Sequence, residues 1–444
     1  MTRRGLVAAL LLAACALPAP ALGWDKPVRL SETMSSFPAI DRHGTIRTLQ
    51  SSTRHRVEAG LLPWGKRRSR RCGVPGVNRK TQFVQSAWRS NDAGQMLFGW
   101  RPAGKHARFR IASAAAGRCF GRRIVAQPAI PRNTEFLGIS LAPLGTLVAS
   151  WVSYDTGDGF ATGHLGGRLR SRGRYGAPGP NLTAAARFAF IRGDRLVRMW
   201  HRSQMLPGPG DRWRETVWGS VSGPRGGRPG KLRKLATAVG SGETLRDLQY
   251  LTDDRGGQVA GGFSDRGFRL MTRRPGRAFG RARLFHTSNP FGNLVETAGN
   301  GRGDAVFAWE TDDRTATYDV YALVRRRSGK VVGPTLISRG EDPKFAGDPA
   351  VGIDGKGRAI VAYVAQDADV SQLVRNQIKV AICGRRGGFG PARSITGPPQ
   401  TISREPEVVV NRRGQAAVWF GRETELPDGN FERHNLLMRG RLGR

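Results

Sequence analysis

A turn followed by a short apolar run recurs along the chain, and it constrains the fold more than any other sequence feature. The clearest copy is Asp354-Gly355-Lys356-Gly357 followed by the run from Arg358 to Tyr363. This run is too short for a helix and ends in an aromatic residue, which is typical of a buried strand. Asp or Asn can bond the backbone two residues later, and glycine tolerates the positive φ of a tight turn. Each copy therefore predicts a hairpin leading into a buried strand.

Eight units of this kind follow one another at intervals of 46 to 63 residues. The turn positions are Gly44, Gly94, Gly145, Asp194, Gly257, Gly303, Gly357 and Gly414. In six units Asp or Asn lies three residues earlier, at Asp41, Asn91, Asp254, Asn300, Asp354 and Asn411. In seven units an aromatic residue lies six residues later, at Trp100, Trp151, Trp200, Phe263, Trp309, Tyr363 and Phe420. This repetition indicates a repeat architecture in which the aromatic residues are buried between neighbouring units.

Each unit holds four strand-like runs, which we call A to D in chain order. In the seventh unit they span 349–354, 358–363, 377–383 and 388–396. A four-stranded unit of about 40 to 55 residues has the size of a propeller blade. The predicted fold is therefore all-β, a single β-propeller of about eight four-stranded blades over residues 24–444.

The two ends of the chain predict how the ring closes. The segment from Trp24 to Ser31 matches the D strand of the seventh unit, Phe389 to Thr396, whereas the last unit ends at its C strand, 435–441. We therefore expect the N-terminal strand to complete the last blade.

On these turn and aromatic positions, the chain after its leader resembles the broad group of secreted bacterial β-propellers with degenerate Asp/Asn-x-x-Gly-x-Ala-x-x-x-Trp repeats. The resemblance is one of architecture and implies no reaction. Asp-box propellers such as sialidases place the Trp three residues after the Gly, whereas here it lies six residues after. No sialidase residue is therefore carried over to this chain.

Residues 1–23 predict a signal peptide. Thr2-Arg3-Arg4 precedes an apolar run from Leu6 to Leu17, and cleavage after Gly23 leaves Trp24 at the start of the first strand. The run is shorter than the ~20 residues of a membrane-spanning helix, so the expected location is secreted or extracytoplasmic. Two variants of the leader stay open: a lipobox that ends at Cys15, which would anchor the protein by a lipid, and a twin-arginine leader.

The other cysteines and the histidines indicate no metal or cofactor. Cys72 and Cys119 occupy similar places in adjacent units, so a disulfide between them and separate structural cysteines, with Cys383 as the third, are both open. The seven histidines form no His-x-x-x-His pair, and the chain has no P-loop and no Gly-x-Ser-x-Gly elbow. The sequence therefore predicts no catalytic residue, no metal and no cofactor.

Charge is the second informative feature. The chain has 72 basic and 34 acidic residues, a net charge of +38. The seven segments that join strands C and D hold 31 basic residues and no acidic one. In a four-stranded blade the A–B and C–D turns lie on one face of the disc, so that face is expected to attract anionic polymers. The candidate polyanion-binding residues are Arg67, Arg68, Arg273, Arg274, Arg325, Arg326, Arg327, Arg385 and Arg386.

The opposite face is expected to be acidic over the last three units. Their B–C loops, 310–318, 364–376 and 421–434, carry nine acidic residues against four arginines. Such loops could bind a cation or supply the acid and base that cleave a glycosidic bond. The candidate residues on this face are Asp155, Glu310, Asp312, Asp313, Asp367, Asp369, Glu423 and Glu425.

Two function classes follow from these patterns. The favoured one is an exported, non-catalytic binding or scaffold propeller at the cell envelope, with its basic face towards an anionic polymer, a membrane surface or a protein partner. The alternative is an envelope polysaccharide hydrolase or lyase with its site on the acidic loop face. Nucleic acid is not an expected partner because the leader predicts export, and the chain is expected to be monomeric.

Overall fold

The structure is a computed structural model of the 444-residue chain. It describes residues 24–31, 35–51, 57–75, 77, 83–102, 110–121, 124–126, 134–153, 158–165, 170–175, 182–206, 212–227, 230–231, 233–241, 246–264, 267–286, 292–312, 318–339, 345–367, 375–396, 402–403, 406–426 and 430–443. The predicted signal peptide lies outside these ranges. Among the residues described, no helix is long and apolar enough to cross a membrane.

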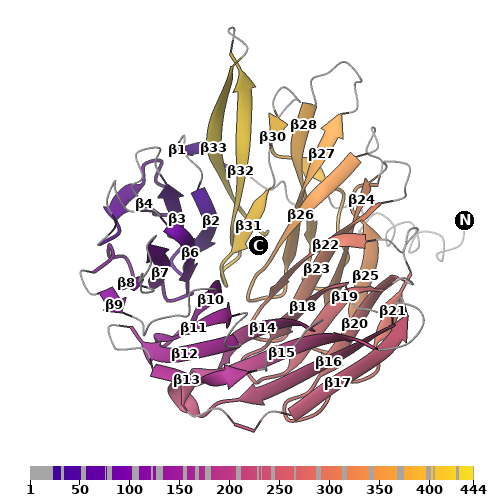
Figure 1. Ribbon diagram of the computed structural model, residues 1–444. Helices are drawn as coiled ribbons and strands as arrows, with labels where there is room; N and C mark the ends of the chain where they lie inside the picture. The colour runs from indigo at the N-terminus through magenta and orange to yellow at the C-terminus, as the bar shows by residue number, and fades with distance from the viewer. Residues whose placement is uncertain are drawn as a thin grey trace, which may run out of the picture.

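The chain forms a β-propeller of four-stranded antiparallel units arranged around a common centre (Figure 1). The first unit comprises β2 (Ser35–Ile40), β3 (Ile46–Ser51), β4 (Val57–Leu62) and β5 (Arg70–Gly73). The second comprises β6 (Phe83–Ser90), β7 (Met96–Pro102), β8 (Arg110–Ala114) and β9 (Ile124–Ala126), and the third β10 (Thr134–Leu141), β11 (Thr146–Ser153), β12 (Asp158–His164) and β13 (Arg170–Tyr175). The fourth comprises β14 (Leu182–Ile191), β15 (Arg195–Met205), β16 (Arg212–Val221) and β17 (Arg233–Ser241), and the fifth β18 (Arg246–Thr252), β19 (Gln258–Ser264), β20 (Gly267–Arg273) and β21 (Arg283–Phe285).

The sixth and seventh units share one hydrogen-bonded sheet. They comprise β22 (Gly292–Gly299), β23 (Ala305–Asp312), β24 (Tyr318–Arg325) and β25 (Val331–Leu336), then β26 (Phe345–Ile353), β27 (Ala359–Asp367), β28 (Arg375–Cys383) and β29 (Arg393–Ser394). A single parallel pair, Tyr318 with Phe345, joins the two. The prediction of a propeller with four-stranded blades is confirmed. The predicted count of eight is too high by one when blades are counted as separate sheets, because this pair merges two units and leaves seven sheets.

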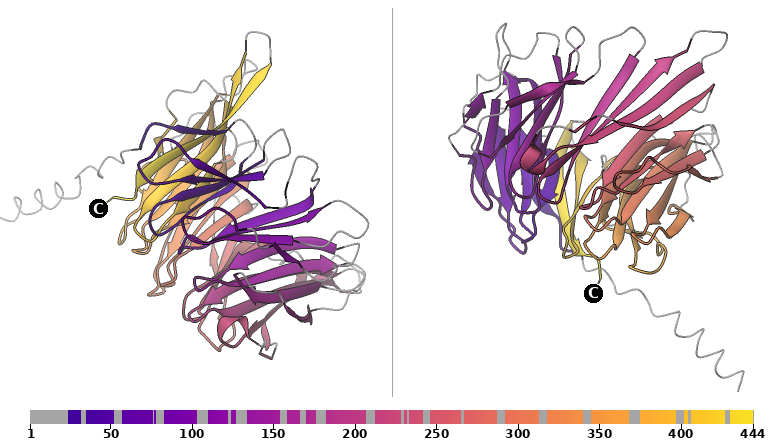
Figure 2. Two further views of the ribbon diagram at one scale, coloured as in Figure 1. Left: turned by 90° about the vertical axis from the view of Figure 1, so that its left-hand side faces the viewer. Right: turned by 90° about the horizontal axis from the view of Figure 1, so that it is seen from below.

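The N-terminal strand closes the ring, as predicted. β1 (Val28–Ser31) lies antiparallel to β33 (Phe431–Arg441), and β33 pairs with β32 (Gln415–Glu425). Two short strands, β30 (Ile402–Ser403) and β31 (Glu407–Val410), complete that sheet on the other side of β32. β32 and β33 extend beyond the neighbouring sheets on the side that carries the B–C loops (Figure 2).

The recurring aromatic residues fill the spaces between units. Trp309 is 0% exposed, and its ring stacks on Phe268 of the fifth unit with centroids 4.4 Å apart. Trp100, Tyr363 and Phe420 are also buried and pack against the preceding unit. The prediction of buried aromatics between blades is confirmed for these positions.

One disulfide adds a covalent link between neighbouring units. Cys72 in β5 is bonded to Cys119, which precedes β9 of the second unit. The pairing that the sequence left open is therefore present, and Cys383 is a free, buried thiol.

The closing strand generates the first prediction. A chain that begins at residue 32 should have a free energy of unfolding at least about 3 kcal/mol lower than a chain that begins at Trp24. The reason is that Val28 and Leu30 are lost from the core and β33 loses a partner strand. Thermal denaturation of the two chains measures the difference. Equal melting temperatures would show that β1 does not hold the ring closed.

The buried indole generates the second prediction. Trp309→Ala should cost about 3 to 5 kcal/mol of unfolding free energy, because it empties a fully enclosed space between two units. Leu144→Ala is the matched control, since Leu144 is 66% exposed and its truncation should change stability by less than about 0.5 kcal/mol. Chemical denaturation would contradict the prediction if both variants were equally stable.

Candidate functional site

The A–B turns surround the centre of the disc, and their Asp or Asn side chains fold them. In the seventh unit Asp354 Oδ1 accepts the N–H groups of Lys356 and Arg358, both at 2.8 Å. Asn300 and Asn411 make the same two bonds in the units on either side. Gly357 has a φ of 80°, which explains why glycine occupies this position. The residues between Asx and Gly are left at the tip of the turn, facing solvent.

Hydrogen bonds link every A–B turn to the next and form a closed ring. In the sixth unit, for example, the side-chain amide of Asn300 donates to the carbonyl of Asp354 at 2.8 Å. Equivalent links join the other turns: Arg42 N–H to Asp92 O, Asn91 Nδ2 to Ala142 O, Leu144 N–H to Asp194 Oδ1, Arg192 N–H to Asp254 O, Asp254 N–H to Gly301 O, Gly355 N–H to Arg412 O, and Asn411 Nδ2 to Asp41 O. The ring fixes the turn tips relative to one another.

One turn borrows its acceptor from the neighbouring unit. The third turn starts with Ala142, which has no side-chain oxygen, and Asp194 of the fourth unit accepts the N–H groups of Leu144 and Thr146 instead. Asp194 is 1% exposed and has a φ of 54°, so it holds the turn position that the sequence assigned to it. The tripeptide Arg192-Gly193-Asp194 is therefore part of the ring, and its carboxylate is not available to a partner.

The fifth turn is shifted by one residue from the predicted register. Asp253 Oδ1 accepts the N–H groups of Arg255 and Gly257, and Gly256 has the positive φ of 87°. The predicted Asp254 and Gly257 are therefore wrong as the turn pair, because two Asp and two Gly stand side by side. The aromatic Phe263 consequently lies seven residues after the turn glycine and packs against Trp309 of the next unit.

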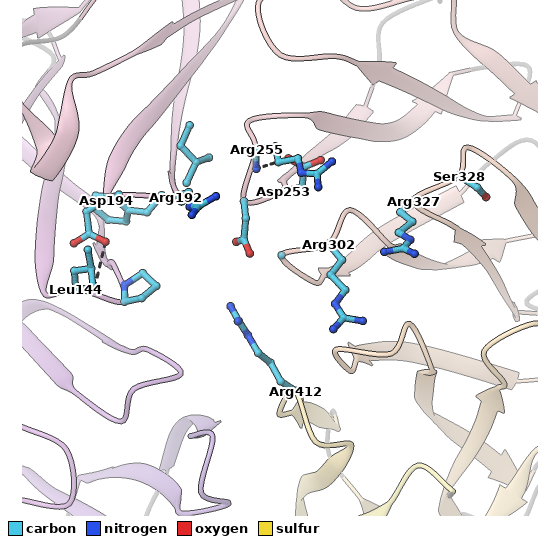
Figure 3. A pocket seen from close by; sticks show the side chains of 15 residues that line it. Leu144, Arg192, Asp194, Asp253, Arg255, Arg302, Arg327, Ser328 and Arg412 are labelled. Atoms are coloured by element: carbon cyan, nitrogen blue, oxygen red, sulfur yellow. Dashed lines mark hydrogen bonds between the residues drawn. The ribbon is translucent and has the colours of Figure 1, made fainter.

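A hollow of about 1280 Å³ lies over the ring on the face of the A–B turns. Five arginines line it, on turns of four units (Figure 3): Arg192, Arg255, Arg302, Arg327 and Arg412. Three aspartates also line it, and two of them, Asp194 and Asp253, hold backbone N–H groups as described above. Arg412 pairs with Asp92 at 2.8 Å, and the other four arginines are exposed.

The predicted basic residues divide into exposed and structural ones. Arg67, Arg68, Arg274, Arg327, Arg385 and Arg386 are exposed. Arg325 is half-buried and donates to the Gly303 carbonyl, and burial lowers its pKa against the opposing effect of Asp253 and Asp304. Arg273 is also half-buried and bonded to Gln258.

The prediction that Arg326 binds a polyanion on the exposed basic face is wrong, because Arg326 is a structural residue. It is buried and donates to the carbonyls of Gly357 and Gly384 and to the sulfur of Cys383. These bonds tie the sixth unit to the A–B and C–D turns of the seventh.

The predicted acidic residues are only partly described. Asp155, Asp313 and Asp369 lie outside the described residues, and for Asp312, Asp367, Glu423 and Glu425 the structure gives the strand position alone. Glu310 is buried and accepts the N–H of Asp348 at 3.2 Å. Glu310 therefore supports the backbone of β26 and is not presented to solvent.

The described part of the chain places other acids in a hollow of about 330 Å³ between A strands. Glu296, Asp348 and Glu407 line it, from β22, β26 and β31. Glu296 is exposed at the surface, and partial desolvation by the surrounding protein raises its pKa. Sequence reasoning missed these residues because it sought acids in loops and not in strands. Among the described residues no three His, Cys, Asp or Glu side chains are grouped to hold a metal ion.

Comparisons with known proteins assign no family to the chain. No protein-family profile and no curated protein matches the sequence. The structure is similar to a lectin, BP39L from Burkholderia pseudomallei (13% identity, TM-score 0.45, 79% of this chain and 98% of that one). It is also similar to the β-propeller domain of the Trilobed protease from Pyrococcus furiosus (9% identity, TM-score 0.42, 79% of this chain and 98% of that one). A third similar structure is an ulvan lyase (10% identity, TM-score 0.41, 83% of this chain and 98% of that one). At these identities and scores the similarities carry no functional argument.

The borrowed acceptor generates the third prediction. Asp194→Gly allows the same left-handed backbone but removes the acceptor of the N–H groups of Leu144 and Thr146. Each N–H group that stays buried without an acceptor should lower the free energy of unfolding by about 1 to 3 kcal/mol. Asp194→Asn is the matched control, because it retains one side-chain oxygen and should lose less. Unfolding free energies measured in denaturant test the order. A glycine variant as stable as the wild type would contradict the role of Asp194.

Proposed function

We propose that the protein is an exported, non-catalytic β-propeller that binds an anionic polymer of the cell envelope. The observation that carries this proposal is the hollow over the turn ring, which five arginines from four units line. A set of like charges held on one rigid face attracts an anionic partner and repels cationic ones. The resemblance to secreted repeat propellers and the predicted leader support the extracytoplasmic location.

The ring explains why the arginines stay available for a ligand. The Asp and Asn side chains at the hub accept backbone N–H groups. Four of the five arginines lie in A–B turns, and Arg327 lies in the C–D turn of the sixth unit. Arg192, Arg255, Arg302 and Arg327 have no side-chain partner among the residues described. Keeping these charges unpaired contributes little to the fold, whereas it suits recognition of an anion.

The alternative, an envelope polysaccharide hydrolase or lyase, is favoured by one observation. Glu296 lies in the acidic hollow and has a raised pKa, a property that suits a proton donor. This function requires a second group acting on the same bond, and the proposal of a binding protein does not. We therefore keep binding as the proposed function.

The fourth prediction tests which face binds. Replacing Arg327, Arg385 and Arg386 with Gln should lower the salt concentration that elutes the protein from a heparin column, because exposed cations release counterions on binding. Arg325 and Arg326 are left intact because Arg325 bonds the A–B turn of its own unit and Arg326 ties the sixth unit to the seventh. The slope of log affinity against log salt should fall by about 0.7 to 0.9 for each ion pair with the polymer that the substitutions remove.

The matched control changes charge by the same amount at acids of the B–C loops, which the sequence assigns to the opposite face. Asp312, Asp313 and Asp367 replaced with Asn should leave elution unchanged if the basic face binds. An increase in retention as large as the decrease in the arginine variant would show that binding follows net charge alone. A wild-type protein that heparin does not retain would contradict the proposed function itself.

A further inference from the structure

The basic face is not uniform, because three hollows meet on one part of it. Besides the hollow over the ring, one of about 400 Å³ lies between the fifth and sixth units and one of about 360 Å³ between the sixth and seventh. Arg302, Arg327 and Ser328 line all three. The hollows therefore adjoin at these residues, and we call the combined surface the basic trough.

The trough is strongly positive. Thirteen basic and four acidic side chains line the three hollows, an excess of nine positive charges. One of the acids, Asp304, is buried and already bonded, accepting the N–H of Arg327 at 2.9 Å and the amide of Asn300 at 3.0 Å. The side chains of Arg302 and Arg327 are exposed and have no partner among the described residues.

The size of the trough favours an extended ligand over a single small molecule. A pocket for one small molecule measures about 300 to 1,000 Å³, and the hollow over the ring alone is about 1280 Å³. Arg274 lines one of the two side hollows, and Arg385 and Arg386 line the other. An extended chain can cross from one hollow to the next and reach both Arg274 and Arg385.

The composition of the trough indicates the chemical class of the chain. All but two of its thirteen basic residues are arginines, the exceptions being Lys330 and Lys356. The planar guanidinium matches the paired oxygens of a phosphate, and equally those of a carboxylate, in a two-point contact. The carboxylates of Asp253 and Asp304 already accept backbone N–H groups of turns. The anion that neutralises the exposed arginines must therefore come from a ligand.

We propose that the basic trough binds a linear chain of phosphate groups laid across the fifth to seventh units, with Arg302 and Arg327 at its centre. The proposal rests on the proposed function and deepens it, because it names the sector of the face and the class of polymer. Arg67 and Arg68 are equally exposed on a C–D turn of the first unit but line none of the three hollows. They should take little part in binding.

The test compares two double variants with the same change in charge. Binding of long-chain inorganic polyphosphate and of triphosphate is measured by calorimetry at several salt concentrations. The long chain should bind the wild type at least tenfold more tightly than triphosphate. Arg302→Gln with Arg327→Gln should weaken long-chain binding at least tenfold and lower the salt slope by about 1.5 to 2. Arg67→Gln with Arg68→Gln should weaken it less than threefold. Unchanged melting temperatures confirm that both variants are folded.

The outcomes separate this inference from the proposed function. If the two double variants weakened binding equally, the basic trough would not be the binding site. The whole basic face would then bind anions. Triphosphate binding as tight as that of the long chain would overturn the linear ligand. Retention on heparin without polyphosphate binding would overturn phosphate as the class. A protein that binds neither polymer would overturn the proposed function together with the inference.

Discussion

The closed ring of hydrogen bonds between A–B turns is the constraint on which the rest of the structure depends. Most of the turns are folded by an Asp or Asn side chain, and every turn is linked to the next, as Asn300 is to Asp354. Where the third unit lacks the side chain, Asp194 of the fourth supplies it. The ring sets the spacing of the units at the centre, and the interleaved aromatics and β1 complete the packing and the closure further out.

The same ring accounts for the charge on one face. Four of its carboxylates, those of Asp41, Asp194, Asp253 and Asp354, accept backbone N–H groups, and arginines such as Arg302 occupy turn tips. Some basic residues serve the fold, as Arg326 does by bonding the turns of the seventh unit and as Arg47 does in its buried ion pair with Asp41 at 3.0 Å. The remaining exposed arginines stand where an anionic chain can reach them.

Repetition made the fold predictable from the sequence, and departures from repetition limited the prediction. Recurrent glycines and aromatics indicated the propeller, its closing strand and the burial of Trp309. The adjacent pairs in Asp253-Asp254-Arg255-Gly256-Gly257 hid the turn register, which depends on which carboxylate meets the backbone. Likewise, three consecutive arginines look alike in sequence, yet only Arg326 among them is buried, because residues of one segment face different neighbours. The meeting of three hollows at Arg302 and Arg327 depends on contacts between units that no single repeat encodes.

Hydrogen–deuterium exchange of the intact protein with and without long-chain polyphosphate tests the central claim most directly, namely that the ring presents its arginines as one binding surface. The account predicts slower exchange of backbone amides in 300–303, 325–330 and 354–357 when the polymer is bound, with no change in 66–73 or 430–436. Protection spread evenly over all turns of the face, or confined to the β32–β33 hairpin, would contradict it.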